Sequence, residues 1–211
     1  MHGKRIAALM FSLTLAAFAP SAYAANVVDE WASVKAPAAP ALKPVTVDPK
    51  TDALFIIDMV SETCNAKGRP RCVATFPAIQ KLLEEARAKN VTVVYSLGPA
   101  GNHFLEQLAP KGTELVVKSG ANKFVNTDLE KMLKEKGITS LIVVGTLANG
   151  GVLQTASDAA LRGFKVVVPV DGMSSPNEST LYSEQYTAWH LGSAPVLGGR
   201  VTLSKVDMIK F

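Results

Sequence analysis

Three short apolar runs end in groups that are suited to acid–base chemistry and anion binding. Asp58 ends the run ALFIID, Lys118 ends the run ELVVK, and the glycine-rich turn 145–151 follows the run TSLIVVG. A carboxyl, an ammonium and the N–H groups at a helix start could together hold and protonate an anionic substrate. We therefore expect the functional site at the place where these three runs end.

The runs belong to an alternation of apolar runs and amphipathic stretches that begins at Ala53, which is typical of βα units around a mainly parallel sheet. The pattern predicts six strands, at 53–58, 91–97, 114–118, 139–145, 164–170 and 200–209. The stretches between them predict four helices, starting at Pro77, at Asn126 or Thr127, at Val152 and at Glu178. The expected fold class is α/β, a three-layer Rossmann-like sandwich, in which ligands bind beyond the carboxyl ends of the strands.

Residues 1–24 have the pattern of a secretory signal peptide. A basic start at 4–5 precedes an apolar run over 6–19, and Ala-Tyr-Ala at 22–24 offers a small-x-small cleavage site. We expect the mature chain to begin near Ala25 and to be periplasmic or secreted, the alternative being an uncleaved signal anchor. No other apolar run reaches the roughly 18 residues of a membrane span, so we expect no membrane association after cleavage.

The composition predicts one domain behind this signal. The chain has 211 residues, of which 48% are apolar and 19% charged, enough to bury the core of one domain. Residues 25–50 contain four prolines without periodicity, which predicts a Pro/Ala-rich linker lying over a domain at 51–211. Without the signal, 20 basic and 18 acidic residues remain, so the formal charge falls from +4 to +2. With that balance we expect no nucleic acid partner.

Cys64 and Cys72 are the two cysteines of the chain. Export to an oxidising compartment favours a disulfide between them, and the alternative is a pair of unpaired thiols. The basic residues Lys67, Arg69 and Arg71 lie between the cysteines, in a solvated loop or in a lid over acidic substrates. The charge run alone favours the solvated loop.

The histidines do not indicate a metal site. His103 and His190, the two that remain after the signal, are far apart in the sequence and not in ligand spacing. Two cysteines are also too few for a multi-cysteine site. We expect no metal and no cofactor.

Three segments together resemble the isochorismatase-like superfamily, whose members are also called cysteine hydrolases. They are LFIIDM at 54–59, the stretch from Lys118 through Phe124 to Leu129, and residues 145–164. Members of this superfamily carry an Asp after the first strand, a Lys after the third and usually a Cys after the fourth. The resemblance covers about residues 53–175 and implies the isochorismatase-like fold, with the homo-oligomeric state of many relatives.

The pattern places the family's nucleophilic cysteine on Gly151. Without a thiolate there, the acyl-enzyme route to amide hydrolysis is closed. The isochorismatases proper also have glycine at this position, and their reaction needs no nucleophilic side chain. The resemblance implies that Asp58 protonates a vinyl ether, that water adds to the oxocarbenium carbon, and that pyruvate departs from a dihydroxy-cyclohexadiene carboxylate. For this role the Asp58 carboxyl has to stay protonated, which burial favours and a nearby cation opposes.

The resemblance assigns the site residues one by one. The catalytic set is Asp58, Lys118 and Gly151, with Lys123 close by as a rival to Lys118, and the substrate contacts are Phe124, Ala148, Asn149 and Gly150. Each has a plainer interpretation: a cap at a strand end, a solvated lysine, a core aromatic or a tight turn. The aromatic residues Tyr182, Tyr186 and Trp189 are expected in the core or in a subunit interface, the alternative being the lining of a substrate pocket.

We therefore expect an exported, homo-oligomeric hydrolase that acts without a cysteine on a small carboxylated substrate. Two departures from the isochorismatases proper bear on the substrate: the stretch YSLGP at 95–99 lacks their Gln, and residues 147–149 lack their Tyr-Ala-His turn. One alternative is a non-catalytic pseudoenzyme that binds a small acid or a protein partner. Another is a structural protein of the envelope.

Overall fold

The computed structural model describes residues 26–33, 35–177, 180–197 and 199–211. The predicted signal peptide lies outside the described residues. The chain divides into two compact units, 1–35 and 36–211. In the described part of the first, the Asn26 side chain accepts a hydrogen bond from the backbone N–H of Val28 (2.8 Å), and a 3₁₀ turn follows at Trp31–Ser33. The helices of the described part are all too short or too polar to cross a membrane.

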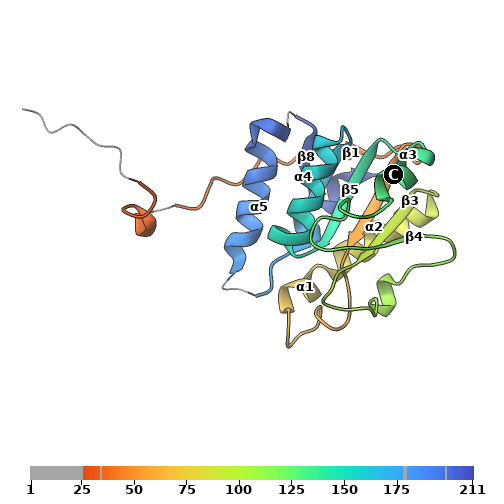
Figure 1. Cartoon of the computed structure of the whole chain (residues 1–211), viewed down its shortest axis with the longest axis horizontal. Coiled ribbons are helices and arrows are strands. Elements are labelled where there is room, and N and C mark those ends of the chain that lie inside the picture. The colour runs from red at the N-terminus through yellow and green to blue at the C-terminus, as the bar shows by residue number, and fades with distance from the viewer. Residues whose placement is uncertain (1–25, 34, 178–179, 198) are drawn as a thin grey trace, which may run out of the picture. The chain divides into compact units, whose positions relative to one another are not determined.

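A parallel sheet of seven strands forms the centre of the second unit (Figure 1). Six strands follow the order β4 (Leu115–Lys118), β3 (Thr92–Leu97), β2 (Asp52–Ile57), β5 (Ser140–Thr146), β6 (Lys165–Pro169) and β8 (Val201–Ser204). The short strand β7 (Met173–Ser174) pairs with β5. The predicted α/β fold with a mainly parallel sheet is confirmed, and β7 is a seventh strand that the sequence pattern did not indicate.

Strand β2 shows how the sheet is buried on both faces. All six of its residues are buried. Phe55 and Ile57 pack into one hydrophobic core, while Leu54 and Ile56 pack into another on the opposite face, because successive side chains of a strand alternate. The first core includes residues of α3 (Leu129–Glu135), α4 (Leu153–Leu161) and α5 (Leu181–Ser193), and the second includes residues of α2 (Phe76–Ala88). The result is the expected three layers.

Helix α2 follows the predicted amphipathic pattern. Its buried residues are Ile79, Leu82, Leu83 and Ala86, which form one stripe at helical spacing. Pro77 lies in the first turn, where its missing N–H costs no hydrogen bond. Asn90 follows the helix with a φ of 58°, a conformation that Asn tolerates better than most residues.

The structure corrects the predicted ends of the domain. Within the predicted linker, β1 (Val45–Thr46) pairs in parallel with β9 (Ile209–Lys210), and Val47 is buried. The single closing strand predicted at 200–209 is divided into β8, a 3₁₀ turn at Val206–Met208, and β9. Two-residue strands are too short to leave a period in the sequence, which is why the pattern did not predict them.

Two helix boundaries also differ from the prediction. The cap of α3 is Asp128, not Asn126 or Thr127, although the Thr127 hydroxyl accepts a bond of 3.4 Å from the N–H of Leu129. The loop after β2 contains a helix of one turn, α1 (Pro70–Ala74). Its five residues are fewer than a helical period needs to be recognised.

Candidate active site

The candidate site lies where the order of the strands reverses. The chain runs from β2 to β3 on one side and later returns to β5 on the other, with Ile57 in register with Ser96 and with Gly145. The carboxyl ends of β2, β3 and β5 therefore meet, which is where open α/β sheets bind ligands.

Asp58 follows directly after β2 in a left-handed conformation with a φ of 50°. Its Oδ1 accepts a hydrogen bond of 2.8 Å from the Ser96 hydroxyl, and its Oδ2 accepts one of 2.7 Å from Nζ of Lys123. A β-carbon at Gly98 would lie 2.8 Å from Oδ2 of Asp58, so glycine is required there for the carboxyl to keep its place. Asp58 is thus fixed from three sides by elements that converge at this edge.

Lys123 is buried completely, with 0% of its side chain exposed. Besides the bond to Asp58, its Nζ donates to the carbonyl of Gly120 at 2.7 Å. Its backbone N–H donates to the Thr155 hydroxyl of α4 at 3.2 Å, which ties the segment after β4 to that helix. A lysine is seldom buried unless its ammonium is paired, and here the partner is Asp58.

The expectation that Lys118 meets Asp58 is corrected by this geometry. Lys118 is the last residue of β4, a strand at the edge of the sheet, and its side chain is exposed. The chain then folds back over the strand ends, held by bonds from the Ser119 hydroxyl to the carbonyls of Asn122 and Val125. This fold-back buries Lys123 in the position expected of Lys118.

The turn after β5 brings two adjacent glycines, Gly150 and Gly151, to the site. The peptide bond from Thr146 to Leu147 is cis, and the carbonyl of Leu147 accepts hydrogen bonds from the N–H groups of Gly150 and Val152. A β-carbon at Gly151 would lie 3.6 Å from Oδ2 of Asp58 and 2.7 Å from Cγ2 of Ile57. The structure therefore brings Gly151 to Asp58, and a larger residue there requires Ile57 to move.

A cavity of about 200 Å³ opens between these segments. It is lined by residues of the β2, β3 and β5 ends and of the neighbouring loops: Asp58, Val60, Thr63, Arg69, Gly98, Pro99, Ala100, Gly101, Gly120, Ala121, Thr146, Leu147, Gly150 and Gly151. Five of the fourteen are glycines, so much of the wall is backbone. The exposed wall is mainly apolar, which suits a small ligand whose polar groups reach the few polar side chains of the lining.

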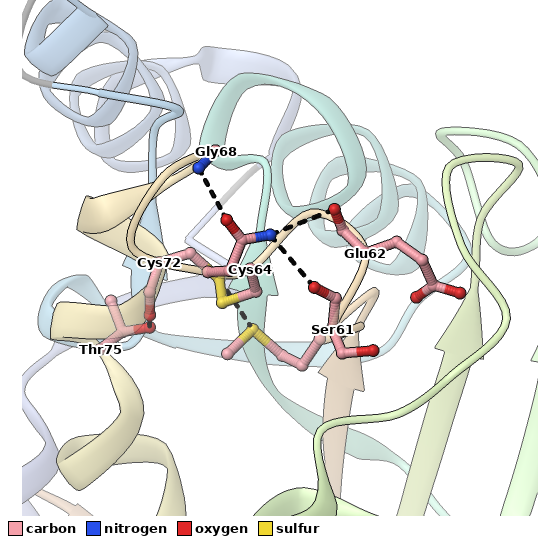
Figure 2. The surroundings of a disulfide bond; sticks show 8 residues. Ser61, Glu62, Cys64, Gly68, Cys72 and Thr75 are labelled. Atoms are coloured by element: carbon pink, nitrogen blue, oxygen red, sulfur yellow. Dashed lines mark hydrogen bonds between the residues drawn. A yellow bond between two sulfur atoms is a disulfide. The ribbon is translucent and has the colours of Figure 1, made fainter.

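The loop after β2 is closed by a disulfide between Cys64 and Cys72, whose Cα atoms are 5.4 Å apart (Figure 2). Both cysteines are buried, and the Cys72 sulfur contacts that of Met59. The Asn65 amide donates to the carbonyls of Ser61 and Glu62 and accepts from the N–H of Gly68. The dashed lines that end at the labelled Ser61, Glu62 and Gly68 in Figure 2 mark these bonds. The segment predicted as a basic loop is thus internally fastened.

Arg69 extends from this loop to the cavity and is partly buried. Burial lowers the pKa of its guanidinium, and the negative charge of Asp58 opposes that shift. Arg71 turns to α5, where it forms an ion pair with Glu184. Lys67 is exposed. Of the three basic residues in the loop, Arg69 is therefore the one that fits the expectation of a lid over acidic substrates.

A second carboxylate, Glu62, stands at the rim of the cavity. It accepts bonds from the backbone N–H groups of Asn102 (2.9 Å) and His103 (3.1 Å) and contacts Nδ1 of His103 at 2.6 Å. These bonds, first among them that of Asn102, lower the pKa of Glu62 to about 2. They fasten the loop after β2 to the loop after β3.

Several predicted contacts lie away from the cavity. Phe124 is buried in the core beside Phe164, with ring centroids 6.0 Å apart. Ala148 is buried in the same core, and Asn149 is exposed. The cavity lining does not include Phe124, Ala148 or Asn149. Of the four expected substrate contacts, the structure therefore brings Gly150 alone to the cavity. His190 packs beside Tyr186, and no cluster of three His, Cys, Asp or Glu side chains suitable for a metal occurs in the described part.

The sequence of this chain matches a known family over most of the domain. The family model described as the isochorismatase domain matches residues 52–197, which include Asp58, Lys123 and Gly151. The chain belongs to the isochorismatase family. The match begins at β2 and ends beyond α5.

Three relatives show the range of this isochorismatase family. A secreted isochorismatase effector of Verticillium dahliae is 31% identical in an alignment 144 residues long, which covers 62% of this chain and 76% of the relative. An N-carbamoylsarcosine amidase of Arthrobacter is 29% identical over 47% of this chain and 49% of its own length. Enterobactin synthase component B of Escherichia coli is 32% identical over 44% of this chain and 34% of its own length. The chain thus spans half or less of the last two proteins.

Solved structures of the isochorismatase family confirm the fold. A cysteine hydrolase from Pseudomonas syringae has a TM-score of 0.67 and 21% identity, covering 81% of this chain and 95% of that protein. The N-carbamoylsarcosine amidase from Thermoplasma acidophilum has a TM-score of 0.62 and 22% identity, covering 74% and 97%. At these identities the likeness concerns the fold alone.

Sequence reasoning missed two residues that this isochorismatase-family site uses. Ser96 was a polar interruption of the apolar run VTVVYSL, one strand away from Asp58 in the sheet. That position is the signal that could have identified it, because a polar residue at the end of a buried strand needs a partner there. Gly98 left no comparable signal in the sequence, because glycine is required there by the nearness of the Asp58 carboxyl in the folded chain.

Proposed function

We propose that this isochorismatase-family protein hydrolyses a small carboxylated substrate of the vinyl-ether type, with Asp58 as the proton donor and without a cysteine nucleophile. The observation that supports the proposal best is the pairing of a cavity-lining Asp58 with the fully buried Lys123 at 2.7 Å. A paired carboxyl at the mouth of a cavity is placed to pass a proton to a bound ligand.

The proposed reaction uses the Asp58–Lys123 pair as one proton store. The ammonium of Lys123 passes a proton to Asp58, which delivers it to the methylene carbon of the vinyl ether. Water then adds to the resulting oxocarbenium carbon, and the hemiketal breaks into pyruvate and the alcohol. The proton lost by the water returns to the pair. Gly151 lines the same cavity beside the carboxyl of Asp58 and has no side chain to stand between that carboxyl and the ligand.

The cysteines favour this route over thiolate chemistry. Both cysteines of the chain are joined in the disulfide, and Gly151 carries no side chain where the family pattern places the nucleophile. An acyl-enzyme on sulfur therefore has no donor atom in this cavity. We accordingly propose that the amidase activity named for some relatives does not extend to this chain.

We also propose that the protein is exported to the periplasm or the medium by its predicted signal peptide. The disulfide fits an oxidising compartment, and one relative is described as secreted. Homo-oligomer formation stays a prediction. The half-exposed side chains of Tyr182 and Trp189 on α5 are consistent with the interface expected there.

The test is pyruvate release from isochorismate by the purified mature chain, followed by coupled reduction of pyruvate, beside Asp58→Asn. We expect the variant to lose turnover by at least about a hundredfold, because an amide cannot donate a proton to carbon. Asn has nearly the same volume, but its one amide oxygen cannot replace both carboxylate oxygens that accept from Ser96 and Lys123, and it leaves the buried Lys123 without an ionic partner. We therefore expect the free energy of unfolding to fall, and turnover is compared at a temperature at which both proteins are folded.

Two outcomes would contradict the proposal. An Asp58→Asn variant with undiminished turnover would remove Asp58 as the acid. A folded wild type that releases no pyruvate would remove isochorismate as the substrate and favour the binding-only alternative, which a screen of carboxylate ligands by thermal shift would then examine.

A further inference from the structure

The cavity carries one positive charge that nothing in its wall balances. Among the described residues of the lining, Asp58 and Arg69 are the two with charged side chains. Lys123 approaches Asp58 from the buried side and neutralises it at 2.7 Å. The ionised Glu62 at the rim is held by the N–H groups of Asn102 and His103, and among the described residues Arg69 has no ion-pair partner within 4.0 Å, so an anion entering the cavity would pair with it.

Arg69 and two hydroxyls beside the cavity have unused hydrogen-bonding capacity. Within the described ranges, the Arg69 guanidinium makes no hydrogen bond and no ion pair within 4.0 Å, although it is partly buried. Thr63 and Thr146 also line the cavity, and their buried hydroxyls have no partner among the described residues. The two hydroxyls expose almost no surface to the cavity, whereas Arg69 is partly exposed there, so a bound carboxylate would give the Arg69 guanidinium a partner.

The loop holds the backbone of Arg69 in place. The N–H of Arg69 donates to the carbonyl of Asn65 at 2.8 Å, and its carbonyl accepts from the N–H of Cys72 at 3.0 Å. The disulfide from Cys64 to Cys72 encloses this segment, and α1 begins directly after Arg69. A guanidinium on such a fastened segment loses less conformational freedom when it binds than one on an open loop.

We propose that Arg69 is the residue that makes this cavity select ligands with a carboxylate. The guanidinium binds the carboxylate through its planar fork, and Asp58 is then left to face the reacting end of the same ligand. The inference deepens the proposed function, since it identifies what recognises the acid group of the substrate, but it can be tested by binding alone.

The experiment compares two unreactive ligands of nearly equal shape, benzoate and benzamide, by isothermal titration of the disulfide-bonded mature chain. We expect the wild type to prefer benzoate, and Arg69→Gln to weaken benzoate binding by at least about tenfold without affecting benzamide. The matched control is Lys67→Gln, which removes one positive charge from an exposed position of the same loop and should bind both ligands like the wild type. Arg69→Lys should recover part of the benzoate affinity.

Three results would overturn the inference. They are a wild type that binds no benzoate at millimolar concentration, an equal loss of both ligands in Arg69→Gln, and an equal loss of benzoate in the Lys67 control. The isochorismate assay is independent of this measurement. If the wild type releases pyruvate but Arg69→Gln binds benzoate unaltered, the role of Arg69 is rejected and the hydrolase is kept. If benzoate binding depends on Arg69 but the wild type shows no turnover, the role of Arg69 is kept and the hydrolase is rejected.

Discussion

Two pairs, each of a carboxylate and a basic group, lie near the end of β2. The distance within each pair is nearly the same, but the burial of the two pairs differs strongly. Asp58 and Lys123 are 2.7 Å apart, with 21% and 0% of their side chains exposed. Glu62 and His103 are 2.6 Å apart, with 33% and 81% exposed. Charges at equal distance attract each other more strongly where water is excluded, so the inner pair and the rim pair should behave differently.

The comparison shows how differently the two carboxylates are satisfied. Asp58 depends on two side chains, Lys123 and Ser96, both supplied by other strands or loops. Glu62 depends mainly on backbone N–H groups of the neighbouring loop, which stay in place whatever the charge of His103. Removing one partner of the inner pair should therefore lower the free energy of unfolding strongly. At the rim, stability should depend mainly on whether Glu62 is ionised.

The largest effect is expected from Lys123→Met, which removes the cation of the inner pair. The carboxylate of Asp58 would keep its bond to Ser96 but lose its ionic partner at a largely buried position. We expect the free energy of unfolding to fall by about 3 kcal/mol, measured by urea denaturation, and pyruvate release to be lost.

Lys134→Met is the matched control for this change. Lys134 pairs with Glu130 at 2.6 Å, but 62% of its side chain is exposed. Its loss should lower the free energy of unfolding by less than about 1 kcal/mol. Equal losses in the two variants would show that burial does not distinguish these pairs, and the comparison would fail.

The same contrast explains which parts of the site the sequence could predict. Asp58 and Gly151 follow strands whose apolar runs are unmistakable, so their meeting at one sheet edge could be inferred from strand order. Lys123 lies in a segment without a period, and its burial depends on a fold-back that is fastened by Ser119 and Thr155. No pattern within the segment distinguishes it from Lys118, because the distinction arises in tertiary structure.

The fold was predictable for a related reason. Central strands such as β2 and β5 are buried on both faces and must be apolar throughout, which makes them visible in the sequence. The short strands β1, β7 and β9 have two residues each, and their stability comes from neighbours that are distant in the sequence. Arg69 likewise gave no separate signal beside Lys67 and Arg71, since its place depends on how the disulfide loop closes.

A smaller effect, visible only with pH, is expected at the rim pair. The pKa of Glu62 is lowered from 4.5 to about 2, so Glu62 stabilises the fold fully above about pH 4.5 and loses that contribution as the pH falls toward 2. In Glu62→Gln this dependence should disappear, because the amide does not titrate. The measurement is the urea midpoint of both proteins at about pH 6 and about pH 3. If the urea midpoint of Glu62→Gln falls between these pH values as much as that of the wild type, the acid sensitivity comes from other groups than Glu62.

The smallest effect is expected from Lys118→Gln, the lysine that the sequence pattern favoured for the site. Its side chain is exposed at the end of an edge strand, and Lys123 occupies the place beside Asp58. We expect the free energy of unfolding to change by less than about 0.5 kcal/mol and kcat/KM for isochorismate to stay within about twofold of the wild type. The two lysines are five positions apart and differ in burial, so this variant and Lys123→Met test whether burial or sequence pattern identifies the working cation. A loss of turnover in Lys118→Gln as large as that in Lys123→Met would return the role to Lys118 and require the segment 119–123 to rearrange when substrate binds.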